Sequence, residues 1–97
     1  MSINRYAARI DANKLAIVDA LRAAGCTVYD AKQPVDLIVG GDDRWTLLLE
    51  IKNPKQPPSK RKHTKAQAAF LATWRGGPVV TVMDVEGALR AVALMRI

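Results

Sequence analysis

The strongest constraint on the fold is the apolar run from Trp45 to Ile51, which contains three consecutive leucines at positions 47–49. Side chains alternate between the two faces of a strand, so consecutive leucines require that both faces be covered. A strand covered on both faces belongs in the interior of a sheet. A second apolar run, Val35–Val39, precedes it across the turn Gly40–Asp43, and the two runs therefore predict a hairpin.

Capping residues and turn residues divide the rest of the chain into elements. Asp11 is a candidate N-cap for a helix that Gly25 ends, and Thr64 and Gln67 form a capping box for a second helix. Asp84 is a candidate N-cap for a third. The remaining predictions are a basic arm over residues 1–10, strands over Thr27–Tyr29 and Pro78–Met83, a proline-rich loop over Asn53–His63 and an apolar tail over Ala93–Ile97.

The order of these elements predicts an α/β fold in one domain over residues 1–97. Three consecutive strands form an antiparallel meander, and a strand–helix–strand unit adds a parallel strand by a right-handed crossover. We therefore expect a mixed sheet flanked by helices on both faces. No run approaches the roughly 20 apolar residues that span a bilayer, and the first residues lack the apolar core of a signal peptide. We expect a cytoplasmic protein with no membrane partner.

The basic residues of the chain, whose formal net charge is +6, are concentrated in one region. No Asp or Glu occurs from Ile51 to Met83. A field this one-sided predicts a polyanionic partner, most simply nucleic acid, and a solvated basic surface is the ordinary alternative. The candidate phosphate-binding residues are Lys55, Lys60, Arg61, Lys62 and Lys65. The single cysteine, Cys26, is interpreted as a small buried hydrophobe.

Three charged residues interrupt the two apolar runs: Asp36, Glu50 and Lys52. Glu50 and Lys52 are two apart on one strand and share a face, and a hairpin can bring Asp36 to the same place. Two carboxylates suit Mg²⁺, with the backbone carbonyl of Ile51 as a further oxygen ligand. Such a cation lowers the pKa of a water molecule, and Lys52 could orient or deprotonate that water or offset charge on the transition state. The pattern predicts a site for phosphodiester hydrolysis.

Each of these residues also has a plain structural alternative. Glu50 and Lys52 could form a surface ion pair, and Asp36 could be a turn residue that follows Pro34. Gln67 has a role in the capping box in any case, and its spacing leaves open whether it also reaches the site.

The same residues resemble the motifs of the PD-(D/E)xK nuclease superfamily. Pro34-Val-Asp36 is similar to the PD half with one residue inserted, and Glu50-Ile-Lys52 is similar to the ExK half. More narrowly, the chain resembles the small, stand-alone, phage-type members of the VRR-NUC family. In that family a loop of Pro, Ser and basic residues follows the ExK strand, and a helix carrying a Gln comes next. The resemblance covers nearly the whole chain from Asp11 onward and implies a restriction-endonuclease-like αβββαβ core.

For function, the resemblance implies cleavage of DNA, plausibly branched, flapped or four-way-junction DNA, by a homodimer in a bacterial or phage-infected cell. It implies Mg²⁺ or Mn²⁺ as cofactor and Asp36, Glu50, Lys52 and Gln67 as catalytic residues. The chain departs from the family in its first helix, where relatives commonly carry an acid near the metal. The nearest residues there are Asp11, Asn13 and Lys14.

Two other functions stay open from the sequence. One is a non-catalytic, basic nucleic-acid-binding module of the same fold, and the other is an interaction protein in which the Glu-x-Lys pattern is incidental. The intact set of charged residues argues against the first, and the basic loop argues against the second.

The basic loop generates one prediction. Neutralising Lys60, Arg61 and Lys62 together should weaken DNA binding and flatten its salt dependence, because each lost phosphate contact releases about 0.9 fewer counterions. Fluorescence anisotropy of labelled DNA across a salt series measures the slope. An unchanged slope would refute the phosphate-binding role.

Overall fold

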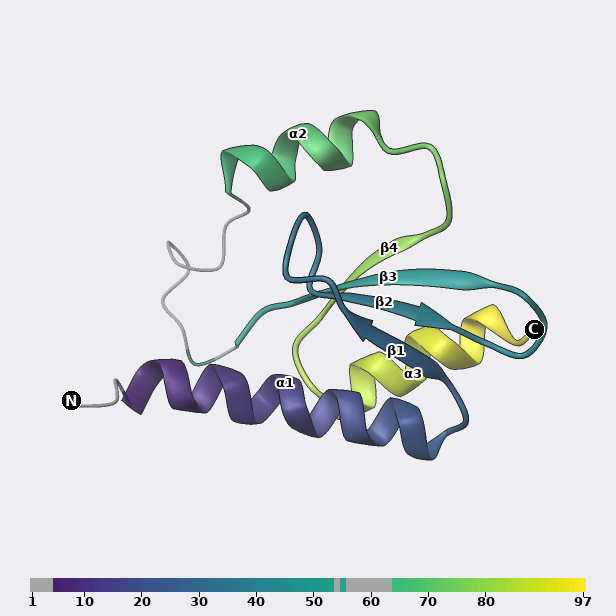
Figure 1. Cartoon of the computed structure of the whole chain (residues 1–97), viewed down its shortest axis with the longest axis horizontal. Coiled ribbons are helices and arrows are strands. Elements are labelled where there is room, and N and C mark those ends of the chain that lie inside the picture. Colours follow the sequence, from purple (N-terminus) through teal and green to yellow (C-terminus); the bar gives the residue numbers. More distant parts are fainter. Residues whose placement is uncertain (1–4, 54, 56–63) are drawn as a thin grey trace.

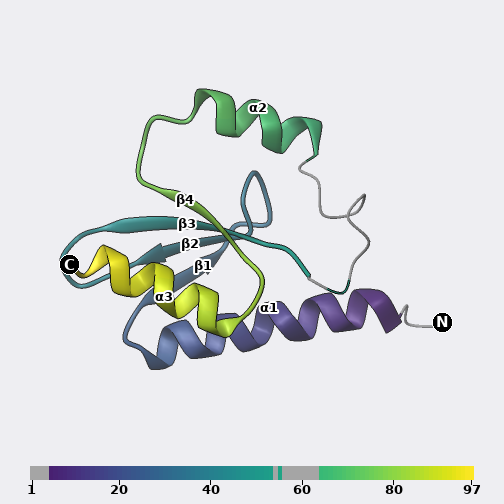
Figure 2. The same ribbon diagram turned by 180° about the vertical axis from the view of Figure 1, so that it is seen from behind.

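The computed structural model of the chain describes residues 5–53, 55 and 64–97, and for residues 5–11 it describes the backbone alone. In these residues a four-stranded sheet carries two helices on one face, α1 (Arg5–Ala23) and α3 (Val85–Met95). A third helix, α2 (Lys65–Thr73), lies over the other face (Figure 1). Seen from behind, α3 and α1 lie side by side across the sheet (Figure 2). The fold is α/β, as predicted.

The sheet has the predicted mixed topology. The strands are β1 (Thr27–Asp30), β2 (Leu37–Gly40), β3 (Thr46–Ile51) and β4 (Val79–Val82), and they lie in this order across the sheet. The first three strands pair antiparallel, and β4 pairs parallel to β3 after the crossover through α2. The order of elements therefore matches the expected αβββαβ core, to which α3 is added.

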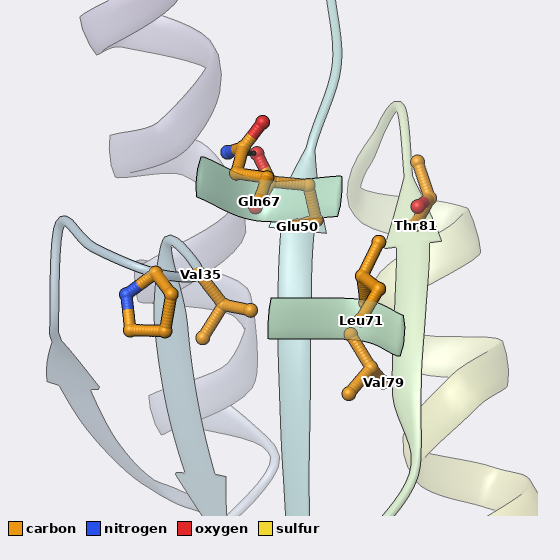
Figure 3. A pocket seen from close by; sticks show the side chains of 7 residues that line it. Val35, Glu50, Gln67, Leu71, Val79 and Thr81 are labelled. Carbon is orange, nitrogen blue, oxygen red and sulfur yellow. Dashed lines mark hydrogen bonds between the residues drawn. The ribbon is translucent and has the colours of Figure 1, made fainter. Parts of the chain in front are cut away.

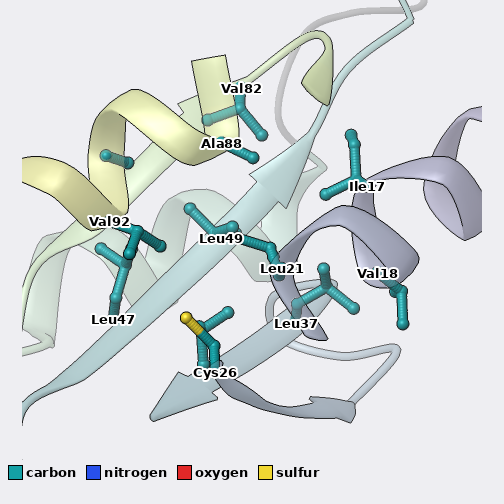
Figure 4. Close-up of a cluster of buried hydrophobic side chains, with 12 residues drawn as sticks. Ile17, Val18, Leu21, Cys26, Leu37, Leu47, Leu49, Val82, Ala88 and Val92 are labelled. Atoms are coloured by element: carbon teal, nitrogen blue, oxygen red, sulfur yellow. The ribbon is translucent and has the colours of Figure 1, made fainter. Parts of the chain in front are cut away.

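The central strand β3 separates two different environments. Leu47 and Leu49 are fully buried and point toward α1 and α3, where the main core lies (Figure 4). Leu48 and Glu50 alternate with them and point to the face beneath α2. Cys26 is buried in the main core, as the sequence predicts for a small hydrophobe.

Helix ends follow the predicted chemistry at three of four places. Gly25 ends α1 with φ of +92°, and the Cys26 N–H donates to the Leu21 carbonyl at 3.0 Å. Thr64 and Gln67 form the capping box of α2, and Asp84 accepts from the Gly87 N–H at 2.7 Å to cap α3. The predicted start of the first helix at Asp11 is wrong.

The first helix begins at Arg5, so most of the expected N-terminal arm is helical. The six residues before Asp11 include two alanines and two arginines and contain no Gly or Pro. These are good helix formers, so the helix continues through a residue that would otherwise cap it.

Other boundaries move by a few residues. Strand β2 begins at Leu37, two residues later than predicted, and α3 takes up the first three residues of the expected apolar tail. The predicted loop over Asn53–His63 lies mostly outside the described residues. None of the described helices is long and apolar enough to cross a membrane.

Candidate active site

The fold brings four of the predicted site residues together at one end of the sheet. Glu50 lies near the end of β3, Lys52 follows that strand, and Asp36 immediately precedes β2. The regular pairing of the two strands ends at Leu37 and Leu49, and the Asp36 N–H donates to the Leu49 carbonyl at 3.1 Å, which holds Asp36 next to the Glu50 end of β3. Gln67 reaches the site from the first turn of α2, above the sheet (Figure 3).

Glu50 is the centre of this cluster. It is only 5% exposed, and it is the one charged residue that is buried among those described. Its Oε1 accepts a hydrogen bond from Gln67 Nε2 at 2.8 Å and lies 3.5 Å from Lys52 Nζ. The Lys52 side chain is itself 12% exposed, so this ion pair is not the surface pair of the structural alternative.

Burial and a second carboxylate raise the pKa of Glu50 from its usual 4.5 to about 7. Desolvation contributes most, and the charge of Asp36 and the hydrogen bond that Asp36 accepts from the protonated form raise the pKa further. Lys52 and the hydrogen bond from Gln67 act in the opposite direction. The two carboxylates therefore lie in a poorly solvated place, and the single positive charge of Lys52 does not balance both of their negative charges.

Gln67 fills both of the roles that its spacing left open. Its Oε1 accepts from the Thr64 backbone N–H at 2.9 Å, which completes the capping box, and its Nε2 donates to Glu50. The two ends of one side-chain amide have opposite hydrogen-bonding character, so a single group can serve the helix and the site together.

Asp36 has a structural contact of its own. Its Oδ2 accepts from the Ile51 backbone N–H at 2.7 Å, where a strand partner would otherwise supply a carbonyl. Ile51 is the last residue of β3 and follows Glu50 directly, so its backbone carbonyl stays the third oxygen ligand that the sequence predicts.

These oxygens fit a divalent cation. When both groups are ionised, as metal binding requires, the hydrogen bonds from described residues engage one oxygen of Asp36 and one of Glu50 and leave the second oxygen of each. With the carbonyl of Ile51, they form the small set of hard oxygen ligands that Mg²⁺ accepts alongside water. The described residues hold no cluster of three or more acidic, His or Cys side chains, so this candidate rests on two carboxylates.

A pocket of about 250 Å³ opens beside Glu50, between β3, β4 and α2 (Figure 3). Thr81 and Leu71, which also line it, were not predicted as site residues. Thr81 is opposite Glu50 in the parallel pairing of β3 and β4, and a register prediction for these strands could have found it. A neighbouring pocket of about 310 Å³ shares Pro34 and Gln67 and runs to the first turn of α2.

Of the five predicted phosphate-binding residues the structure describes two, and neither lines the two pockets beside Glu50 and Gln67. Lys55 and Lys65 are exposed, and Lys65 is the first residue of α2, beside the second pocket. Lys60, Arg61 and Lys62 lie outside the described residues.

In the first helix, where relatives in the VRR-NUC family commonly carry an acid near the metal, the structure describes the side chains of Asn13 and Lys14. Lys14 Nζ is 2.7 Å from Asp30 Oδ1, and Asn13 donates to the Met83 carbonyl at 3.2 Å. Both side chains therefore have partners away from Asp36 and Glu50. The side chain of Asp11 lies outside what the structure describes.

No family model, curated protein or solved structure matches this chain.

The raised pKa of Glu50 predicts how stability depends on pH in the absence of divalent cations. Between about pH 4.5 and 7 the folded state holds more protons than the unfolded state, so the free energy of unfolding falls as pH rises. Glu50→Gln removes this loss. The variant should therefore gain roughly 1–3 kcal/mol relative to wild type on going from about pH 4.5 to pH 8, measured by urea unfolding in EDTA.

A matched control is Glu86→Gln, because Glu86 is exposed on α3 and pairs with Arg90 at 2.8 Å on the surface. Its relative stability should change little over the same range, since exposed ion pairs contribute little. Equal pH profiles for the two variants would contradict the burial of an acidic Glu50.

Proposed function

We propose that this protein is a metal-dependent DNA endonuclease that hydrolyses phosphodiester bonds, preferentially in branched, flapped or four-way-junction DNA. The observation that supports the proposal most is the convergence of Asp36, Glu50 and Lys52 beside one pocket. Burying one carboxylate beside another destabilises the fold, so packing would not favour this pair. Such clusters are enriched at functional sites. The resemblance to the VRR-NUC family is part of this proposal.

Each residue has a role in the proposed reaction. A Mg²⁺ or Mn²⁺ ion held by Asp36, Glu50 and the Ile51 carbonyl would supply an activated water and offset phosphate charge. The Lys52 ammonium, 3.5 Å from Glu50 Oε1, would orient that water or stabilise negative charge that develops on the phosphate. Gln67 holds one oxygen of Glu50 and so fixes the orientation of its carboxylate.

The proposal includes a homodimer that acts inside a bacterial or phage-infected cell. Two sites related by a two-fold axis would suit symmetric incisions in a four-way junction. Light scattering after size-exclusion chromatography tests this part, and a monomer that cleaves junctions symmetrically would refute it.

Cleavage assays test the central proposal. Purified protein is incubated with labelled four-way-junction, flap, linear duplex and single-stranded DNA in Mg²⁺, Mn²⁺ or EDTA. We expect cleavage with either metal, fastest on branched DNA, and none in EDTA. Lys52→Ala and Glu50→Gln should each lower the rate by at least about a hundredfold, as removal of a charge-stabilising group does.

Arg90→Ala is the control, because Arg90 is exposed on α3 and far from the site in the fold. Mg²⁺ should also raise the melting temperature of wild type at about pH 8 more than that of Glu50→Gln, by mass action. Cleavage without metal, or undiminished cleavage in both site variants, would rule out the mechanism. Binding without cleavage under every metal would instead support the non-catalytic binding module.

The double role of Gln67 generates a separate prediction. Gln67→Glu keeps the acceptor of the capping box but replaces the donor to Glu50 with another carboxylate. Helix content by circular dichroism should be unchanged, whereas the cleavage rate should fall at least about tenfold.

Thr64→Ala is the complementary variant, since it removes the cap and leaves the Gln67 side chain. It should cost about 1 kcal/mol of stability and reduce cleavage less than Gln67→Glu does. If the two variants reduce cleavage equally, Gln67 acts through the helix alone.

A further inference from the structure

A basic groove lies on the face of the sheet opposite α2, between α1 and the edge strand β1. Its volume is about 590 Å³, and it is lined by Lys14, Leu15, Val18, Arg22, Asp30 and Lys32. Three cations from α1 and the β1–β2 loop thus face one carboxylate. None of these six residues belongs to the cluster around Glu50.

Among the side chains that the structure describes, the internal contacts of the groove use only a few of its hydrogen-bond donors. Lys14 bonds Asp30 at 2.7 Å, which neutralises one charge and fixes the direction of the ammonium. Arg22 donates one hydrogen bond to the Val28 carbonyl at 3.3 Å. A guanidinium carries five donors and an ammonium three, so the contacts with described residues occupy only part of the hydrogen-bonding capacity of Arg22 and Lys14.

Lys32 is placed at some local cost. Its φ is +67°, in the left-handed region that Gly or Asn occupies more readily. The loop nevertheless presents a long cation to the groove at this position. Its next residues, Gln33 and Pro34, line the pockets beside Glu50.

The groove and the candidate active site meet at this loop. Lys32 and Pro34 are two residues apart, so their Cα atoms lie within about 7 Å. The register places the groove and Glu50 at the same end of the sheet, on its two faces, because Asp30, Leu37 and Leu49 stand in one row across the sheet. Two strand spacings cover about 10 Å, and Glu50 is the residue after Leu49.

We propose that this groove binds the phosphodiester backbone of a nucleic-acid strand that continues from the candidate active site around the β1–β2 loop. Repeated phosphates at short intervals suit separate cations on two elements, whereas a compact anion would need them to converge on one point. This inference rests on the proposed nuclease function for the direction of the strand. The binding itself is measured without catalysis.

The test compares two double variants that each remove two positive charges. Lys32→Asn with Arg22→Gln alters the groove. Arg44→Asn with Arg90→Gln is the control, because Arg44 also has a positive φ, +65°, and Arg90 is also an exposed helical arginine. Asn retains the left-handed conformation at both loop positions.

Anisotropy of a labelled four-way junction and of a labelled single strand is measured in EDTA from about 50 to 200 mM salt. The groove variant should bind on the order of tenfold more weakly than wild type at low salt, with a log–log salt slope shallower by about 2. The control should change both quantities much less. Melting temperatures within a few degrees of wild type establish that both variants fold.

Equal losses in the groove and control variants would overturn the groove and leave the nuclease proposal to its cleavage assay. If the groove variant alone loses binding and the wild-type protein never cleaves DNA, the proposed binding groove is supported and the proposed nuclease function is refuted. Wild type that binds labelled polyglutamate but neither DNA would overturn the proposal in favour of an acidic polypeptide partner.

Discussion

The burial of the Glu50 carboxylate is the constraint on which the rest of this structure depends. It sits on a strand whose alternate side chains, Leu47 and Leu49, form the centre of the main core, so β3 cannot shift to release it. A one-residue slip would exchange the two faces: Leu47 and Leu49 would lie beneath α2, and Leu48 and Glu50 would face the main core. The packing energy of the core therefore keeps the Glu50 carboxylate in a buried position, although its desolvation disfavours that position.

The surrounding polar contacts follow from that placement. Lys52 and Gln67 both approach Oε1, whereas Asp36 approaches from the neighbouring strand and uses one oxygen to replace a missing backbone acceptor. Asp36 thus contributes to the sheet and to the charge of the site at once. Its removal would leave the Ile51 N–H without its acceptor and would also relieve the repulsion that raises the pKa of Glu50.

The sequence predicted the parts of this arrangement that depend on local rules. Three consecutive leucines located the central strand, and a two-strand hairpin was enough to place Asp36 near Glu50. The start of α1 was missed because Asp is favourable at an N-cap but is also accepted inside a helix, so Asp11 alone does not decide where the helix begins. Thr81 was missed because it enters the site through the long-range register of β4, and the pKa of Glu50 could not be read from residue types because burial is a sum over the whole fold.

Helix α2 gains little stability from packing, since none of its nine residues is buried. Its capping box and its hydrogen bond to Glu50 are made by the same glutamine, so the donor is in place only while the first turn is folded. A segment with little buried apolar surface opens locally at low free energy. Local opening of α2 would therefore remove the Gln67 donor from Glu50 while the sheet and the main core remain folded.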